Sequence, residues 1–449
     1  MISNNNVTNV KFLNHSSVLI QEGSSFVLTD PWYESISFGS WLSVPPCSVH
    51  PAYLVALSKQ VDNFTIAISH GHDDHLDDSF LSLFPSNTKV VVPKYRSKGL
   101  IKRINRAGLT NIHEVDEEGE SVGGFTFKSY INPVICPDDA IITIAGKKHF
   151  IVHANDNWQK LEKSPLNKIT SDAQTYGSKN RLYMSQCNLA DGWPDIYRDY
   201  TEEEKVAIHK NRVENIITNT ISNAEMVGCE YFLNYAGHAS AFVNNDSKLR
   251  AITSFVSNKT VSDLVDKRFR IQVLDMVPGD SFDFKQVTKQ FAGVTLEDAL
   301  LKESSWDFYK SYNLVSKCDS QRLEKDVFDY PFKIKMDYFL SAFEKFVTSR
   351  VYKSNFNSDI VGFKVILKSP TEAAEIIIGG EEKFNNKTVI FHIENGILKL
   401  LLSGEIIWEN LYIGYEAEVE TVPPKINVRA PVRWLASFGY VYQIRSRNV

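Results

Sequence analysis

The chain has 449 residues, of which 43% are hydrophobic and 23% are charged, and its formal net charge is −5. This composition predicts a soluble globular protein of about two or three domains, and the slightly acidic balance argues against a nucleic-acid partner. The N-terminus has no basic-then-apolar signal, and no apolar run approaches the roughly 18 residues that span a membrane, so we expect a cytoplasmic protein without a membrane partner.

Alternating strands and helices are predicted along roughly the first 260 residues. Runs of β-branched and aromatic residues predict strands at 10–23, 24–32, 64–69, 88–94, 123–131, 140–146, 149–154, 180–186 and 230–237. Helices are predicted at 95–108, which ends at Gly108, and at 201–226, where Thr201 and Glu204 form a capping box. This alternation is typical of an α/β fold.

The sequence changes in character from about residue 266 onward. A helix is predicted at 337–352, and strand-like runs follow at 360–367, 373–380 and 387–396. We therefore expect two parts, an α/β domain over residues 1–265 and a C-terminal α+β region over residues 266–449 that packs on it.

The cysteines argue against a protein held together by disulfides. They are odd in number, widely spaced, and stand at Cys47, Cys136, Cys187, Cys229 and Cys318. Such a set fits a reducing compartment. No C-x-x-C pair indicates a zinc finger, and no paired cysteines and histidines have the spacing of a Rieske iron–sulfur cluster.

The stretch SHGHDDHLDD places His70, His72, Asp74 and His75 directly after the predicted strand 64–69. Alternate side chains of a strand face the same way, so His70 and His72 point together, whereas Asp74 and His75 fall in the following turn. The first pair can take one metal ion and the second pair another, and these donors suit zinc, iron or manganese. A solvated polar loop is the alternative, but the four-residue spacing favours a metal site.

The H-x-H-x-D-H spacing after an apolar strand resembles that of the metallo-β-lactamase fold superfamily. The resemblance implies an α/β fold of four layers, an αβ/βα sandwich with a C-terminal α+β extension, and makes residues 1–265 the metal-binding domain. It also implies three more ligands. Asp156 matches the bridging carboxylate, with His153 as its rival or as a residue behind the ligands. His238 matches the last histidine, and a structural role is its alternative.

The remaining ligand is where this chain departs from the superfamily. The resemblance implies a histidine shortly before the strand 140–146, and none stands there. Cys136 fits the position, and a thiolate can bind zinc or iron. Asp138, Asp139 or an open coordination position are the alternatives. The identity of the metal stays open for the same reason.

Two further passages resemble a narrower group. The DPW sequence at 30–32 implies that Asp30 lies near the site with His15 close behind it. The sequence SGEIIWENLYIGYEAEV at 403–419 resembles the C-terminal region of CMP-N-acetylneuraminate hydroxylases. Those enzymes also carry an N-terminal Rieske domain, whereas this chain begins directly with the lactamase-like part. The resemblance therefore implies a separate electron donor, a ferredoxin or a reductase.

Two reactions follow from these resemblances. The favoured one is a dinuclear non-haem iron oxygenase, similar to a hydroxylase, with two divalent metal ions and a polar small-molecule substrate such as a sugar- or nucleotide-containing metabolite. Asp74 and Asp156 would be its catalytic carboxylates. The alternative is a dizinc or other dimetal hydrolase of an ester, amide or phosphodiester, in which Asp74 orients or deprotonates a water. A degenerate, binding-only relative is a third possibility, which the intact motif disfavours.

The loop SQCNLADGWPDIY at 185–197 is expected beside the metal site. Asn188, Asp191 and Trp193 are predicted to bind substrate, with the tryptophan as a stacking platform for a sugar or base. A surface loop with one buried tryptophan is the alternative. Trp408, Tyr412 and Tyr415 are expected to pack in a core.

Overall fold

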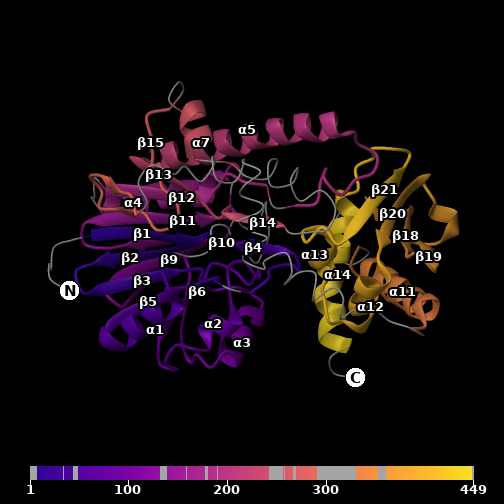
Figure 1. Cartoon of the computed structure of the whole chain (residues 1–449), viewed down its shortest axis with the longest axis horizontal. Coiled ribbons are helices and arrows are strands. Elements are labelled where there is room, and N and C mark those ends of the chain that lie inside the picture. Colours follow the sequence, from indigo (N-terminus) through magenta and orange to yellow (C-terminus); the bar gives the residue numbers. More distant parts are fainter. Residues whose placement is uncertain are drawn as a thin grey trace.

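Two large β-sheets lie face to face, with helices on both outer faces and a smaller third sheet to one side (Figure 1). The computed structural model describes residues 8–33, 35–43, 49–131, 139–157, 159–176, 180–189, 191–241, 256, 258–265, 269–290, 330–351 and 360–446. Among the described helices, none has both the length and the apolar character that crossing a membrane requires.

The first sheet turns from antiparallel to parallel across its width. Its order is β17 (Val287–Thr288), β16 (Ser281–Phe282), β1 (Thr8–Asn14), β2 (Ser17–Glu22), β3 (Ser25–Thr29), β5 (Asn63–Ala67), β6 (Lys89–Pro93), β7 (Asn111–Val115). The strands from β3 to β7 are parallel. Their outer face is covered by α1 (Pro51–Gln60), α2 (Asp78–Leu81) and α3 (Gly99–Arg106), whose apolar side chains share one buried cluster with the strands.

The second sheet has the same kind of cover on its opposite face. Its order is β15 (Gln272–Val273), β13 (Tyr231–Tyr235), β12 (Asn180–Gln186), β11 (His149–Asn155), β10 (Ala140–Ala145), β9 (Phe125–Ile131), β8 (Glu120–Val122). Its outer face packs on α4 (Lys163–Thr175), α5 (Glu202–Val227) and α7 (Asn258–Val265). Because β11, β12 and β13 are parallel, their carboxyl ends meet at one edge of the sheet.

The inner faces of the two sheets form a shared core. Alternate residues of each strand point inward, among them Phe12 and Ile20 of the first sheet and Ile144 and Met184 of the second. Each of these is at most 1% exposed. The layers are therefore helix, sheet, sheet, helix, and the predicted αβ/βα sandwich is confirmed.

The C-terminal part forms its own α+β unit beside the sandwich. Its sheet has the order β19 (Ala373–Ile377), β18 (Phe363–Lys368), β20 (Lys387–Ile393), β21 (Ala417–Val422). It packs with α11 (Phe332–Val351), α12 (Asn395–Ser403), α13 (Trp408–Tyr412), α14 (Arg429–Ser446) and a short 3-10 turn, η2 (Glu381–Lys383). A two-stranded ribbon of β4 (Trp41–Ser43) and β14 (Ala239–Ala241) lies between the two parts (Figure 1).

The sandwich extends beyond residue 265, the boundary expected from sequence. The strand β16 pairs with β1, and β15 pairs with β13, so the segment 272–288 belongs to the two large sheets. Strands of two residues have almost no periodic pattern in the sequence. The sequence therefore placed the end of the first part earlier than the structure does. The described C-terminal elements begin at Phe332.

The sandwich and the C-terminal sheet are joined by backbone hydrogen bonds. The segment 196–198, between β12 and α5, runs beside β21. Val419 donates to the carbonyl of Ile196 at 2.8 Å, and Arg198 donates to the carbonyl of Val419 at 2.9 Å. The free edge of β21 thus pairs with a segment of the other part.

Candidate metal centre

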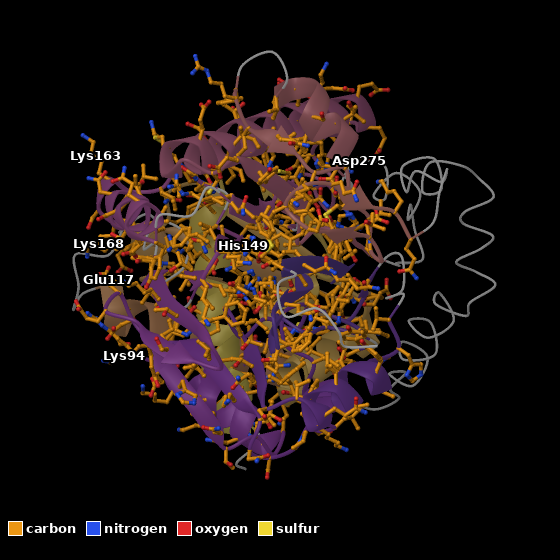
Figure 2. All side chains as sticks on the ribbon, turned by 90° about the vertical axis from the view of Figure 1, so that its left-hand side faces the viewer. Lys94, Glu117, His149, Lys163, Lys168 and Asp275 are labelled. Carbon is orange, nitrogen blue, oxygen red and sulfur yellow. The ribbon has the colours of Figure 1, made fainter. Side chains whose placement is uncertain are left out.

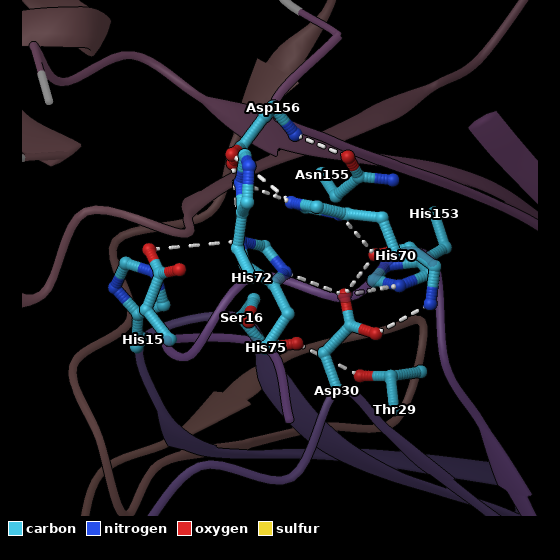
Figure 3. A network of polar contacts seen from close by, with 12 residues as sticks. His15, Ser16, Thr29, Asp30, His70, His72, His75, His153, Asn155 and Asp156 are labelled. Carbon is cyan, nitrogen blue, oxygen red and sulfur yellow. Dashed lines mark hydrogen bonds and ion pairs between the residues drawn. The ribbon is translucent and has the colours of Figure 1, made fainter. Parts of the chain in front are cut away.

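The predicted motif lies where the carboxyl ends of strands from both sheets converge (Figure 3). Asp30 follows β3, the segment from His70 to His75 follows β5, and Asp156 follows β11. Because the carboxyl ends of parallel strands share one edge, residues far apart in sequence come together here.

His70, His72 and Asp156 meet on one side of the site. Nε2 of His70 lies 2.8 Å from Nδ1 of His72 and 3.7 Å from Oδ2 of Asp156. On the other side of the ring, Nδ1 of His70 is 3.0 Å from the hydroxyl of Ser69 and 3.7 Å from Oδ1 of Asp139. Burial lowers the pKa of His70 well below its ordinary value, and the charges of His75 and His72 lower it further. His70 is therefore neutral, the form that binds metals.

Asp74, His75 and His15 meet on the other side. Nε2 of His75 is 3.3 Å from Oδ1 of Asp156 and 3.8 Å from Oδ2 of Asp74, and the same oxygen of Asp74 is 3.3 Å from Nε2 of His15. Burial opposes a charge on His75, but Asp156 and Asp74 outweigh it and raise its pKa well above the ordinary value. The carboxylates thus attract a cation, a proton or a metal ion, to Nε2 of His75.

Two overlapping sets of donor atoms have the dimensions of metal sites. The donor atoms of His70, His75 and Asp156 lie within 4.8 Å of one another, and so do those of His15, Asp74 and His75. Donors that share a metal at about 2 Å stand about 3 to 4 Å apart. Oδ1 of Asp74 and Oδ1 of Asp139 are buried without a hydrogen-bond partner, which is costly for a carboxylate unless a cation balances it. These residues therefore fit a pair of metal ions.

The carboxyl groups of the site lie close enough to shift one another's pKa values. Burial raises the pKa of Asp139 well above its ordinary value, and the charge of Asp156 raises it further. Burial also opposes ionisation of Asp156 and Asp74, but the neighbouring histidines, His75 foremost, together outweigh it and lower both pKa values, that of Asp74 to about 2. Cations held between these groups would favour the charged form of all three carboxylates.

Asp30 is the centre of the hydrogen-bond network behind the donors (Figure 3). Its Oδ2 lies 2.8 Å from Nδ1 of His75 and 2.9 Å from Nε2 of His153. Ser69 donates to Asp30 twice, from its backbone N–H and from its hydroxyl, at 2.7 Å each. Burial opposes ionisation of Asp30, but His153 and His75 outweigh it and hold its pKa well below the ordinary value.

Four strand ends at the site have backbone conformations that side chains other than glycine rarely adopt. The angle φ is +33° at His15, +30° at Asp30, +41° at Asn155 and +44° at Ala236. Each such residue costs on the order of 1–3 kcal/mol and persists only where its surroundings enforce it. These four lie next to the donor atoms, as expected of strain retained for a functional arrangement.

The sequence-predicted ligands divide into three groups. His70, Asp74, His75 and Asp156 come together in the two donor sets, and His72 lies within hydrogen-bond distance of the first. His238 is 2% exposed and stacks edge-on against Phe12 at 4.8 Å, outside both described donor sets. Cys136 and Asp138 lie outside the described residues, whereas the alternative Asp139 is buried beside His70.

The residues expected behind the ligands lie close to them. Asp30 and His153 contact each other in the buried network behind the donor atoms. His15 lies closer to the donors than expected, since it joins a donor set itself. The sequence did not indicate this position of His15, because residues 10–23 have the pattern of one strand, whereas His15 lies in a turn between β1 and β2.

A small apolar cavity adjoins Asp74 and His15, with room for about one water molecule. Its walls include Trp32, Phe38 and Trp41 of the sandwich, and Ile413 of the C-terminal part. The indole N–H groups of Trp32 and Trp41 donate to the backbone carbonyls of Ser35 and Ile413. The tryptophans therefore turn carbon surface, not hydrogen-bond donors, toward the cavity.

The three predicted substrate-binding residues make contacts with other residues of the protein in this structure. Asn188 lines the cavity, but its amide donates to the carbonyl of Gly237 and accepts from the N–H of Val256. Asp191 forms an ion pair with Arg212, whose guanidinium lies 4.9 Å from the centre of the Trp193 ring. Substrate contact by these residues stays a prediction.

Comparison with known proteins gives distant structural likenesses only. No protein-family model and no curated protein matches the sequence. A possible metal-dependent hydrolase from Veillonella parvula DSM 2008 is 12% identical with a TM-score of 0.41, and the match covers 62% of this chain and 99% of that one. Igni18, a metallo hydrolase from Ignicoccus hospitalis, is 12% identical with a TM-score of 0.40, covering 62% and 100%.

The solved structure of CmlA, a diiron β-hydroxylase from Streptomyces venezuelae, is 14% identical with a TM-score of 0.37. The match covers 60% of this chain and 53% of that one. At such TM-scores these likenesses carry no conclusion about the chemistry of this chain. The fold rests on its own strand order and layers, and the chemistry on its own donor atoms.

Proposed function

We propose that this chain is a dinuclear metalloenzyme that uses iron to activate dioxygen and oxidise a small metabolite. The observation that carries the proposal is the composition of the buried cluster. Three aspartates, Asp74, Asp139 and Asp156, surround the imidazoles, and two of their oxygens have no hydrogen-bond partner. Carboxylate and imidazole donors with open positions suit iron and manganese as well as zinc.

The donors divide between two metal ions. His70 and His72 would hold one, His15, Asp74 and His75 the other, and Asp156 would serve both, because its two oxygens face His70 and His75. Asp139 would balance charge from the Nδ1 side of His70. Bound iron would supply one-electron chemistry with dioxygen. The electron donor would be a separate ferredoxin or reductase.

The protein side chains contribute orientation and exclusion of water. Asp30 orients His75, and Ser69 orients Asp30. The apolar cavity beside Asp74 would hold the part of the substrate next to the reacting group, and its size and carbon-lined walls favour a compact apolar group there. A sugar or nucleotide moiety would then lie farther from the metals.

Hydrolysis is the second candidate, and one observation favours it. The Asp74 carboxylate is ionised and keeps Oδ1 without a hydrogen-bond partner, so this oxygen can accept a hydrogen bond from an attacking water and orient it. Two zinc ions in the same donor sets would then lower the pKa of that water.

Metal content and oxygen consumption decide between the two. We expect the full chain, purified without chelator, to contain two irons and to consume dioxygen when a chemical reductant is added. Two zinc ions per chain, with no response to reductant and dioxygen, would leave hydrolysis as the function. In His72→Ala we expect one metal ion to be lost, and two retained ions would refute that ligand.

A further inference from the structure

A continuous chain of buried side chains leads from the inter-sheet core to the candidate metal centre. The hydroxyl of Tyr235, on β13, is hydrogen-bonded to Nδ1 of His153, on β11. Nε2 of His153 lies 2.9 Å from Oδ2 of Asp30, which lies 2.8 Å from Nδ1 of His75. All four side chains are fully buried, so no water competes for these polar contacts.

The direction of each hydrogen bond in this chain is determined by its neighbours. The backbone N–H of Asn155 donates to the oxygen of Tyr235 at 3.1 Å, which leaves the phenol hydrogen to be donated to His153. Burial raises the pKa of Tyr235 well above its ordinary value, and the charge of Asp30 raises it further, so the phenol keeps this hydrogen. Nδ1 of His153 is then the acceptor, which leaves the ring hydrogen on Nε2.

The series of contacts continues through Asp30 to His75. Nε2 of His153 lies 2.9 Å from Oδ2 of the anionic Asp30, the distance of an ion-pair contact, and Asp30 accepts the Nδ1 hydrogen of His75. Nε2 of His75 is left to face Asp156 and Asp74, where a metal ion would replace a proton. The close contact from His153 thus holds Asp30 in the orientation in which it fixes the tautomer of His75.

We propose that Tyr235 and His153 are positioning residues that fix, through Asp30, the ring orientation and tautomer of His75 for metal binding. The inference rests on the proposed metal function and holds for iron and for zinc. Groups that orient a metal-binding histidine typically change metal affinity by roughly 10- to 100-fold when they are replaced. In this protein Tyr235 would act on Nε2 of His75 through two intervening side chains, those of His153 and Asp30.

The test uses cobalt(II) binding to the full chain, followed by its visible absorption spectrum, which reports the geometry at the metal. We expect His153→Leu to weaken binding of one of the two cobalt ions by roughly tenfold or more and to shift its spectrum. Tyr235→Phe, which removes one oxygen only, should act in the same direction with a smaller effect. His153→Gln should restore much of the affinity, because its amide can donate to Asp30.

Matched controls separate positioning from packing. His149 is a buried histidine at the opposite end of β11, and Figure 2 labels it in the view from the side away from the C-terminal part. Tyr183 is a fully buried tyrosine on the neighbouring strand β12. His149→Gln and Tyr183→Phe should bind two cobalt ions with wild-type affinity and spectrum.

The outcomes also separate this inference from the proposed function. A wild-type chain that binds no cobalt would contradict the metal function, and this inference with it. A wild type that binds two ions, with Tyr235→Phe and His153→Leu equal to the controls, would overturn the positioning role and leave the metal function intact. If His153→Leu does not fold, Tyr235→Phe decides alone.

Discussion

His15 is a buried side chain that lies among the donor atoms of the candidate metal centre. It lies in the turn between β1 and β2, is 5% exposed, and packs edge-on against Trp32 at 5.1 Å. Neither ring nitrogen has a hydrogen-bond partner. A buried imidazole in this state beside a carboxylate is a candidate ligand, whereas the predicted ligand His238 packs against Phe12.

Substitution of the two histidines tests this assignment. We expect His15→Ala to lower the metal content from two ions per chain to one, because Asp74 and His75 alone would hold the second ion weakly. His238→Ala is the matched variant and should keep two ions. Elemental analysis of both proteins gives the answer, and the opposite result would return His238 to the ligand set.

Glu409 makes stability depend on pH. It is buried in α13, and burial raises its pKa from 4.5 to about 8, opposed by a backbone hydrogen bond and aided by the charge of Asp73. The folded chain therefore binds more protons than the unfolded chain between these two pH values. The free energy of unfolding falls as the pH rises through this window.

We expect Glu409→Gln to flatten this dependence, because the amide cannot ionise. The midpoint of thermal unfolding, measured at roughly pH 6 and pH 9, should fall for the wild type and change less for the variant. Glu372→Gln, at an exposed position, is the control. Equal slopes for all three proteins would contradict the buried-acid assignment.

For single residues, the spacing of a local motif could be interpreted from the sequence, whereas contacts between distant segments could not. His70, His72, Asp74 and His75 could be predicted because six consecutive positions carry the pattern. The link from His153 to Asp30 and from Tyr235 to His153 could not, since it depends on how strands from two sheets face each other. Cys136 stays a prediction, while Asp139 has the contacts that the sequence left open.

At the scale of single elements, helices with explicit ends were the most predictable. The capping box at Thr201 and Glu204 is present, and α5 ends at Gly228 with φ +80°. The segment 10–23 was predicted as one strand, yet it forms β1, a turn and β2, because His15 and Ser16 make the turn without glycine or proline. Helices such as α12 and α14 were missed because their apolar residues did not separate clearly from strand patterns.

The capping box of α5 gives a prediction at this scale. The hydroxyl of Thr201 accepts from the N–H of Glu204 at 3.3 Å, and the Glu204 carboxylate accepts from the N–H of Thr201 at 2.9 Å. Thr201→Ala should cost about 1 kcal/mol of unfolding free energy. The unfolding midpoint should fall by about 2–4 °C. Thr175→Ala, within α4, leaves every cap intact and should change it less.

At the scale of the whole molecule, the segment from Trp408 to Tyr415 joins the two parts. Ser40 donates to the carbonyl of Gly414 at 2.5 Å, and Tyr415 donates to Asp195 at 3.2 Å. Trp408 and Tyr415 belong to a hydrophobic cluster that also contains Trp32 and Trp41 of the sandwich. These contacts hold the C-terminal part against the sandwich.

At Gly414 the contact between the two parts leaves no space for a side chain. A Cβ atom there would lie 1.9 Å from the carbonyl oxygen of Phe38 and 2.2 Å from that of Asn410, and both are backbone atoms. Gly414→Ala should therefore loosen the C-terminal part and increase cleavage between the two parts in limited proteolysis. Gly99→Ala, whose nearest neighbour is a flexible serine hydroxyl at 3.3 Å, is the control. Identical digestion patterns would show that the contact tolerates a methyl group.

The pairing of β21 with the segment 196–198 has a consequence for how molecules meet one another. An open strand edge presents unpaired amide and carbonyl groups and invites the strands of other molecules to pair with it. Here that edge is satisfied from within the same chain, by the segment that follows the strand β12. The contact that seats the C-terminal part beside the sandwich therefore also covers a template for aggregation.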